Sequence, residues 1–417
     1  MDFYPNICLR KAKAPGRPGR RKTIKLRLQN RRQEDIKALK IPKMRILIAC
    51  DKFKGSLSAK EACEALREGL GAADASIEVG VCPVADGGEG FAESMVMARG
   101  GKWHSCESLD ALGRPIEVRY GMVSNERGED EAVMEMAEAS GLHRIPIESR
   151  DVLRSSSLGT GSMIRNAVEQ GVHRIFLGIG GSATNDGGMG VLAGLGVKFR
   201  DEQGGELEPV PTSLASLVEV DAGGMIELPP IEVACDVENP LLGPKGATMV
   251  YGPQKGAGKE ARHILEDGLT RLVEVTGHGV LAETPGAGAA GGLGFGLLGF
   301  AGARLRHGFE MVAEALNLSG LVAACDVVIT GEGSLDEQTF QGKAPAGVAR
   351  IAREHGKKVI AVGGRVDPTC SEQRMFDRVL TLESFEVGEE QSMARAEELL
   401  QALGPELREV LVELRKS

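Results

Sequence analysis

Aromatic residues are scarce in this sequence. Phe, Tyr and Trp make up 4% of 417 residues, with one Trp and three Tyr. Proteins that bind single-stranded nucleic acid stack the bases on several aromatic side chains, so the composition disfavours that activity. Apolar runs of about 18 residues, the length of a membrane-spanning helix, are also missing. Neither a nucleic-acid partner for the folded body nor a membrane partner is expected.

Paired cysteine motifs are absent as well. The eight cysteines are scattered, and neither a CxxC motif nor a cysteine–histidine zinc spacing occurs. No GxSxG elbow suggests hydrolase chemistry. Scattered free thiols in a chain of this size are typical of a reducing cytosol. We therefore expect a cytoplasmic protein without structural zinc or disulfides.

Charge is unevenly distributed along the chain. Residues 1–43 hold fourteen Lys/Arg against three Asp/Glu, so the formal charge of −9 leaves −20 for residues 44–417. A body this acidic is not expected to bind a polyanion. The extension 1–43 is interpreted as a disordered basic arm, a targeting segment or a region upstream of the true start. We favour a start at Met44, where an apolar strand begins at once.

Short apolar runs alternate with helical patterns in the rest of the chain, which predicts a mainly parallel α/β protein. Ser56 or Ser58 is the predicted N-cap of the first helix. The predicted strands are 46–50, 77–83, 133–136, 174–178, 231–235, 326–330 and 358–362. The predicted helices are 59–71, 90–99, 155–171, one from about 189, 261–276, 346–354 and 390–415.

Glycine, in contrast, is abundant. The 57 glycines are nearly twice the average share. Glycine-rich segments leave backbone N–H groups free to bind phosphate oxygens, and carboxylates beside them suit a metal-bound nucleotide. The combination points to phosphoryl transfer, although no G-K-[ST] follows the glycines as in a Walker A motif. The four segments are ADGGEG (85–90), GIGGSATNDGG (178–188), PGAGAAGGLG (285–294) and TGEGSLDEQTFQGKAP (330–345).

The segment 178–188 is the most specific of the four. Asp186 could accept a substrate hydroxyl proton or bind a metal, and the sequence does not separate these roles. The loop also offers close backbone approach, hydroxyl groups and an amide from Gly180, Gly181, Ser182, Thr184 and Asn185.

The remaining candidates lie in loops after predicted strands. Lys54 could neutralise a phosphate or a carboxylate. Asp86 could hold Mg²⁺, or could merely charge the N-terminus of the next helix. The segment 285–294 is either a phosphate or adenine loop or a site of close helix packing. The further candidates are Gly288, Gly291 and Gly292 for phosphate, Asp236, Glu332 and Asp336 for metal or hydroxyl, and Lys255 and Lys343 for phosphate.

These motifs resemble those of the bacterial glycerate kinases of the non-P-loop type, which act in glyoxylate and sugar-acid breakdown. The resemblance runs in family order from about residue 44 to about residue 365, and it leaves out the basic extension. Two departures are the first strand end, Cys50-Asp51-Lys52, where Pro-Asp-Ser is expected, and GGRVD at 363–367. The matching segments are FKGSLSA (53–59), ADGGEG (85–90), MAEASGL (136–142), LGTGSMI (158–164), LGIGGSATNDGG (177–188), ACDVENPLLGPKGA (234–247), GPQKGA (252–257), PGAGAAGGLG (285–294) and TGEGSLDEQTFQGKAP (330–345).

The resemblance implies a kinase that uses ATP and Mg²⁺ to phosphorylate D-glycerate, with the 2-hydroxyl favoured. It also implies two α/β domains with the active-site cleft between them. One is a flavodoxin/Rossmann-like domain of residues 44–120 plus 290–417, and the other is inserted as residues 121–289. A monomer or homodimer is expected.

On this interpretation Lys54, Gly180 and Gly181 would bind the glycerate carboxylate. Asp186, Asn185 and Lys54 would be catalytic, Asp86, Asp236 and Asp336 would serve the metal, and Lys255 and Lys343 would face phosphate. Two alternatives stay open. The first is a dinucleotide-dependent oxidoreductase, but this sequence lacks the GxGxxG motif expected after the first strand. A non-catalytic sugar-acid regulator could use the basic arm to touch DNA.

Overall fold

A five-stranded sheet, entirely parallel, carries the two ends of the described chain. Its order is β13-β12-β11-β1-β2. Counted along the chain, this is the 2-1-3-4-5 order of flavodoxin-like sheets, in which ligands bind where the strand order reverses. Here the reversal lies between β1 and β11, which pair in parallel. The strands are β1 (Arg45–Cys50), β2 (Glu78–Val81), β11 (Val327–Leu335), β12 (Lys358–Val366) and β13 (Arg378–Thr381).

The computed structural model describes residues 44–340, 343–367 and 375–416. They belong to one unit, Met44–Ser417, which is described by itself. The predictions for the extension 1–43 lie outside the described residues. None of the helices in the described part has the length and hydropathy that a bilayer span needs.

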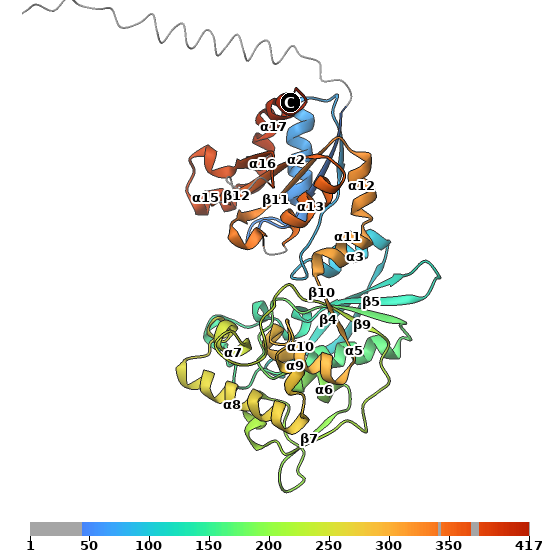
Figure 1. Ribbon diagram of the computed structural model, residues 1–417, viewed down its shortest axis with the longest axis vertical. Helices are drawn as coiled ribbons and strands as arrows, with labels where there is room; N and C mark the ends of the chain where they lie inside the picture. The colour runs from blue at the N-terminus through green and yellow to red at the C-terminus, as the bar shows by residue number, and fades with distance from the viewer. Residues whose placement is uncertain (1–43, 341–342, 368–374, 417) are drawn as a thin grey trace, which may run out of the picture. The chain divides into compact units, whose positions relative to one another are not determined.

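The helix after β1 begins at its predicted cap. In α2 (Ala59–Ala73), Ser58 Oγ accepts a hydrogen bond from the amide of Glu61, and the Glu61 side chain accepts from the Ser58 amide. This reciprocal pair is a capping box. Helices α16 (Ala396–Ala402) and α17 (Gly404–Leu414) lie beside α2 (Figure 1). They approach closely, since a Cβ on Gly404 would lie 2.0 Å from the Gly69 carbonyl oxygen.

The single helix predicted for 390–415 is wrong, because three short helices occupy that stretch. Arg395 leaves the helical region with φ −115° and separates α15 (Glu389–Ala394) from α16. Pro405 at the start of α17 begins a new helix, as proline does at a first turn. Two further helices pack on the first sheet, α12 (Leu318–Ala324) and α13 (Ala344–Glu354). In contrast, α3 (Phe91–Arg99) packs on the second sheet described below, and α11 (Gly308–Ala315) contributes to the cores of both sheets.

A second, six-stranded sheet has the order β10-β9-β6-β5-β4-β3. Its four strands from β5 to β10 are parallel, whereas β3 and β4 join it as antiparallel partners. This antiparallel pair is not among the predicted strands. The strands are β3 (Lys102–Leu109), β4 (Pro115–Ser124), β5 (Asp130–Glu135), β6 (Arg174–Gly178), β9 (Ile231–Ala234) and β10 (Arg304–Arg306), and β7 (Lys198–Arg200) pairs separately with β8 (Glu219–Asp221).

Sheet membership differs from the predicted domain limits. Residues 102–120 were assigned to the first domain, but β3 and β4 pair with β5 of the second sheet. Likewise β10 at residues 304–306 pairs with β9. The chain therefore changes sheet between β2 and β3 and again between β10 and β11. The limits at 120/121 and 289/290 do not coincide with these changes, and the insertion itself stays a prediction.

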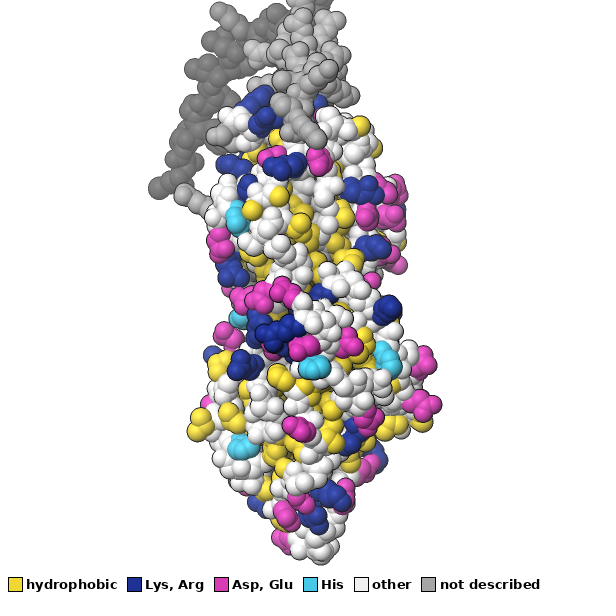
Figure 2. Space-filling model, turned by 90° about the vertical axis from the view of Figure 1, so that its right-hand side faces the viewer, with side chains coloured by type: hydrophobic (Ala, Val, Ile, Leu, Met, Phe, Trp, Pro, Cys, Tyr) yellow, Lys and Arg dark blue, Asp and Glu magenta, His cyan; other side chains and the backbone are white. Residues whose placement is uncertain are grey.

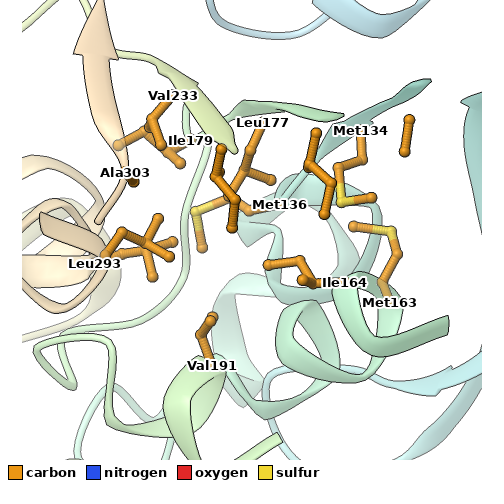
Figure 3. Packing of buried hydrophobic residues seen from close by; sticks show 14 of the residues in the cluster. Met134, Met136, Met163, Ile164, Leu177, Ile179, Val191, Val233, Leu293 and Ala303 are labelled. Atoms are coloured by element: carbon orange, nitrogen blue, oxygen red, sulfur yellow. The ribbon is translucent and has the colours of Figure 1, made fainter. Parts of the chain in front are cut away.

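An apolar core covers one face of the second sheet, and a second apolar cluster includes the helices between residues 247 and 282. Met134, Leu177 and Val233 point from three strands toward Ile164 of α5 and Leu293 of α10 (Figure 3). The helices here are α5 (Leu158–Glu169), α6 (Met189–Gly194), α7 (Ala247–Tyr251), α8 (Lys259–Thr276), α9 (Gly279–Ala282) and α10 (Ala289–Phe300), with α4 (Ala137–Ser140) after β5. On the face shown in Figure 2, acidic and basic side chains of the described residues are interspersed, so this face offers a polyanion no continuous basic surface.

Candidate active site

Loops from both sheets enclose a charged cavity of about 870 Å³. This is within the usual range for sites that bind small ligands. We call it the charged cavity. Its ionisable lining residues are Asp51, Lys52, Lys54, Asp86, Glu89, Glu93, Arg119, Glu135, Glu138, His143, Arg150, Glu332, Asp336 and Lys343, and Gly180 and Gly181 complete one wall.

Asp51 lies at the reversal point of the first sheet. It follows β1 directly, and its amide donates to the carbonyl oxygen of Gly331 at 2.8 Å. The residue is 3% exposed. Burial, followed by the charge of Asp86, raises the pKa of Asp51 to about 7, while Lys52 opposes the shift. A carboxylate that titrates near neutral pH suits a general base.

Glu332 lies beside it on β11. The predicted strand 326–330 extends instead to Leu335, because β12 pairs with it as far as Val366. Glu332 accepts a hydrogen bond from Thr339 Oγ1 at 2.7 Å and lies 3.5 Å from Lys343 Nζ. Burial raises the pKa of its carboxyl, and Lys343 opposes this. The structure thus brings Glu332, Asp336 and Lys343 together in the charged cavity, as the sequence analysis expected.

The turn Asp86–Gly90 is fixed from two sides. Lys52 Nζ lies 3.8 Å from Asp86 Oδ1 and donates to the Glu89 carbonyl oxygen at 2.8 Å. Beneath the turn, Glu135 accepts hydrogen bonds from the amides of Gly90 and Ala92. Burial raises the pKa of Glu135 to about 7. Asp86 faces the cavity, as predicted for a metal ligand.

Asp236 has a different place from the one expected. It does not line the charged cavity, and its two oxygens accept from the amides of Gly87 and Gly308 at 3.0 and 2.9 Å. Burial raises the pKa of Asp236 to about 6, and the hydrogen bond from Gly308 and the neighbouring His307 oppose this shift. Asp236 therefore anchors the glycine turn, and the metal role predicted for it has no support from this geometry.

The loop 178–188 contributes backbone to the cavity. Gly180 and Gly181 line it, and a Cβ on Gly180 would lie 2.8 Å from Gly88 Cα. Only glycine permits this approach of the two glycine-rich motifs. The polar residues that follow are buried and lie outside the lining: Ser182, Thr184 and Asn185.

Asp186 is also buried, and its carboxylate is occupied by protein donors. Oδ2 accepts from Ser157 N, Ser157 Oγ and Gly190 N, and Oδ1 accepts from Gly188 N, at 2.7–3.1 Å. Burial raises its pKa, and these four hydrogen bonds oppose the shift. The side chain joins the starts of α5 and α6 and does not line the cavity, so the geometry does not support the predicted catalytic role.

Lys255 supports the same loop from inside. Its Nζ donates to Ser182 Oγ at 2.8 Å and to the Thr184 carbonyl oxygen at 2.6 Å. Burial lowers the pKa of Lys255 to about 7, and the charge of Asp186 opposes the shift. Nearby, Asn185 donates to Thr248 Oγ1 at 3.1 Å. Lys255 thus holds the loop in place and does not reach the cavity where a phosphate was expected.

The glycines of 285–294 serve close packing. Gly291 has φ +70°, and a Cβ there would lie 2.1 Å from the Thr184 carbonyl oxygen. Gly187 donates its amide to the Gly291 carbonyl oxygen at 3.0 Å. Gly288 and Gly292 are similarly enclosed, by Pro240 and by Leu241 with Gly187. The geometry favours the packing interpretation over the phosphate loop.

The donor set fits Mg²⁺ bound chiefly by a nucleotide. In the described part of the chain, no group of three or more His, Cys, Asp or Glu forms a ready metal cage. Asp51, Asp86 and Glu332 nevertheless share one cavity, and Asp86 raises the pKa of both others. Mg²⁺ in kinase sites is held by one or two carboxylates plus phosphates and water.

The second sheet supplies cavity residues that the sequence analysis missed. The guanidinium of Arg119 on β4 lies 4.1 Å over the ring of Trp103 on β3, and its Nε is 3.8 Å from Glu138. His143 and Arg150 complete this wall. An isolated arginine on an antiparallel strand carries no sequence signal. Asp51, by contrast, could have been chosen because it directly follows a buried strand.

A parallel sheet with lysines and carboxylates gathered at its reversal point is typical of α/β proteins that bind small anionic ligands. Residues 46–411 match the Glycerate kinase family. The chain belongs to this family, which confirms the resemblance.

The relatives cover most of the chain. It is 40% identical to the glycerate kinase of Bacillus subtilis over 366 residues, which are 86% of this chain and 95% of that protein. It is 42% identical to the glycerate 2-kinase of Escherichia coli over 327 residues, 77% of this chain and 85% of that protein. The crystal structure of a glycerate kinase 2 from Salmonella typhimurium LT2 matches with a TM-score of 0.77 and 38% identity, over 90% of this chain and all of that one.

Proposed function

We propose that this protein transfers the γ-phosphoryl group of ATP to the 2-hydroxyl of D-glycerate, giving 2-phosphoglycerate and ADP. Family membership supports the activity. The observation that carries the proposal is the meeting of Asp51, Asp86, Glu332 and three lysines in one cavity at the strand reversal. Phosphoryl transfer needs positioning and charge neutralisation more than covalent chemistry from the protein.

Asp51 is the carboxylate we assign as general base in place of Asp186. The glycerate hydroxyl oxygen would attack the γ-phosphorus, its proton would pass to Asp51, and the bond to the bridging oxygen of ADP would break. Asp86 and Glu332 would hold Mg²⁺, which neutralises phosphate charge when bound with ATP. Lys52, Lys54 and Lys343 face the same space and would pair with phosphate or carboxylate oxygens.

The remaining expectations belong to the same proposal. We infer a cytoplasmic enzyme that functions as a monomer or homodimer and needs no nucleic-acid partner for its folded body. Glycerate, a small anion, would bind through lysines and the backbone of Gly180 and Gly181, which line the cavity together with Lys54. The oxidoreductase alternative gains no support from the family or from the site.

The test is release of ADP from ATP and Mg²⁺ with D-glycerate, L-glycerate or no acceptor, with the product identified by ³¹P NMR. Turnover with D-glycerate alone and a 2-phosphoglycerate signal would support the proposal. Nucleotide binding without turnover of glycerate would refute glycerate as the phosphoryl acceptor. A folded protein that binds no nucleotide would refute the kinase.

A further inference from the structure

A smaller pocket opens beside the charged cavity. Its volume is about 260 Å³. The two cavities lie side by side, because they share six lining residues: Asp51, Lys52, Lys54, Glu89, Gly90 and Glu93. Lys52 and Lys54 therefore stand at the junction of the two cavities.

Away from the residues that it shares with the charged cavity, the smaller pocket is lined mainly by apolar groups. Leu57, from the loop before α2, and Met97, from α3, line it together with Val84 and Ala85, which follow β2. Met97 is 45% exposed, which is high for a large apolar side chain. A ligand with an apolar surface would cover it, whereas a small polar acid would gain little there.

Away from the residues shared with the charged cavity, the polar lining residues are Ser56, Ser58, Lys60 and Ser94. Ser94 lines the pocket and is 5% exposed. Within the described residues its hydroxyl has no side-chain hydrogen bond, whereas the hydroxyls of Ser56 and Ser58 bond to Phe53 and Glu61. A hydroxyl can donate to or accept from a ring nitrogen.

We propose that this pocket binds the purine base of the nucleotide donor, with the phosphates running past Lys52 and Lys54 into the charged cavity. The inference rests on the proposed function. A purine has apolar faces for Leu57 and Met97 and a polar edge for Ser94. Lys52 and Lys54 are the cations that the phosphate groups would meet at the junction, beside the carboxylates of Asp51, Glu89 and Glu93.

The test compares two ligands that share the triphosphate chemistry but differ in the base. Leu57→Ala and Met97→Ala shorten the proposed walls, and Leu321→Ala, an exposed leucine on α12 outside both cavities, is the matched control. Calorimetry is run with ADP and with inorganic tripolyphosphate. We expect each wall variant to weaken the binding of ADP about tenfold, which is the scale of a few lost apolar contacts. Tripolyphosphate binding should stay within about twofold.

The outcomes separate this inference from the proposed function. ADP binding unchanged in both wall variants, or ADP and tripolyphosphate weakened equally, would overturn the base pocket and leave the kinase standing. Failure of the folded wild-type protein to bind ADP or ATP would overturn both. Photolabelling with 2-azido-ADP gives a direct second readout: attachment within residues 83–97 supports the pocket, and attachment confined to other segments contradicts it.

Discussion

Replacing Asp186 by Asn separates a structural carboxylate from a catalytic one. An Asn side chain keeps one oxygen at the Oδ2 position, where Ser157 N, Ser157 Oγ and Gly190 N donate. The amide nitrogen then faces the Gly188 amide, which loses its acceptor. A buried donor left without a partner costs about 1–3 kcal/mol. The three retained bonds also become neutral and weaker, whereas removal of the buried charge offsets part of the loss.

We therefore expect the free energy of unfolding of Asp186→Asn to fall by about 2 kcal/mol, measured by urea denaturation. Turnover per folded molecule should fall less than about tenfold, because Asp186 lies outside the charged cavity. The matched variant Asp51→Asn should behave oppositely, with turnover reduced by at least about 10²-fold, the scale of a lost general base. Wild-type stability in Asp186→Asn combined with a 10²-fold loss of turnover would refute the reasoning and restore the base to Asp186.

Three further experiments test the same distinction between residues that act in the charged cavity and residues that support it. Asp51 must be ionised to act as base and burial raises its pKa to about 7, so turnover should rise with pH through neutrality; a flat pH–rate profile from pH 5 to 9 would contradict this. Burial lowers the pKa of Lys255 from 10.5 to about 7. Between these two pH values the unfolded chain binds one proton more than the folded protein, so the free energy of unfolding should rise with pH across that range. Lys255→Met should remove that rise in the free energy of unfolding, measured by urea denaturation from pH 7 to 10. An unchanged dependence on pH in this variant would argue against Lys255 as the cause of the rise. Gly291→Ala should lower the free energy of unfolding by about 2 kcal/mol or more through its contact with Thr184 and its positive φ, without a selective loss of nucleotide affinity by calorimetry.

The parallel fold was predictable because its central strands β1 and β11 are almost entirely buried. The run Ile46–Cys50 is apolar and entirely buried in β1, and Ser58 caps α2 as its sequence context indicates. The antiparallel pair β3–β4 was missed although Ile116, Val118 and Tyr120 of β4 alternate with exposed residues, which is the period-two pattern of a strand with one buried face. The length of β11 was underestimated because its pairing with β12 continues through Gly331 and Gly333, residues that ordinarily end a strand.

The site was predicted in part, and the part that failed has one physical cause. Asp86 and Asp186 both stand beside glycines at the start of a helix, where a carboxylate is stabilised by backbone amides. A sequence shows that preference but not which way the carboxylate faces. In the fold, Asp86 faces the cavity, whereas the Asp186 carboxylate accepts hydrogen bonds from Ser157, Gly188 and Gly190.

The same ambiguity applies to lysine and glycine, and burial resolves it. Lys343 keeps its ammonium at the cavity beside Glu332, whereas Lys255 is enclosed and donates to the loop that carries Gly180 and Gly181. A phosphate-binding lysine must reach a ligand, so a lysine whose ammonium is enclosed and hydrogen-bonded inside the protein acts on the ligand only through the loop it supports. The glycine-rich motifs therefore combine two functions: some residues contact the charged cavity, and the others hold those residues at the carboxyl ends of the two sheets.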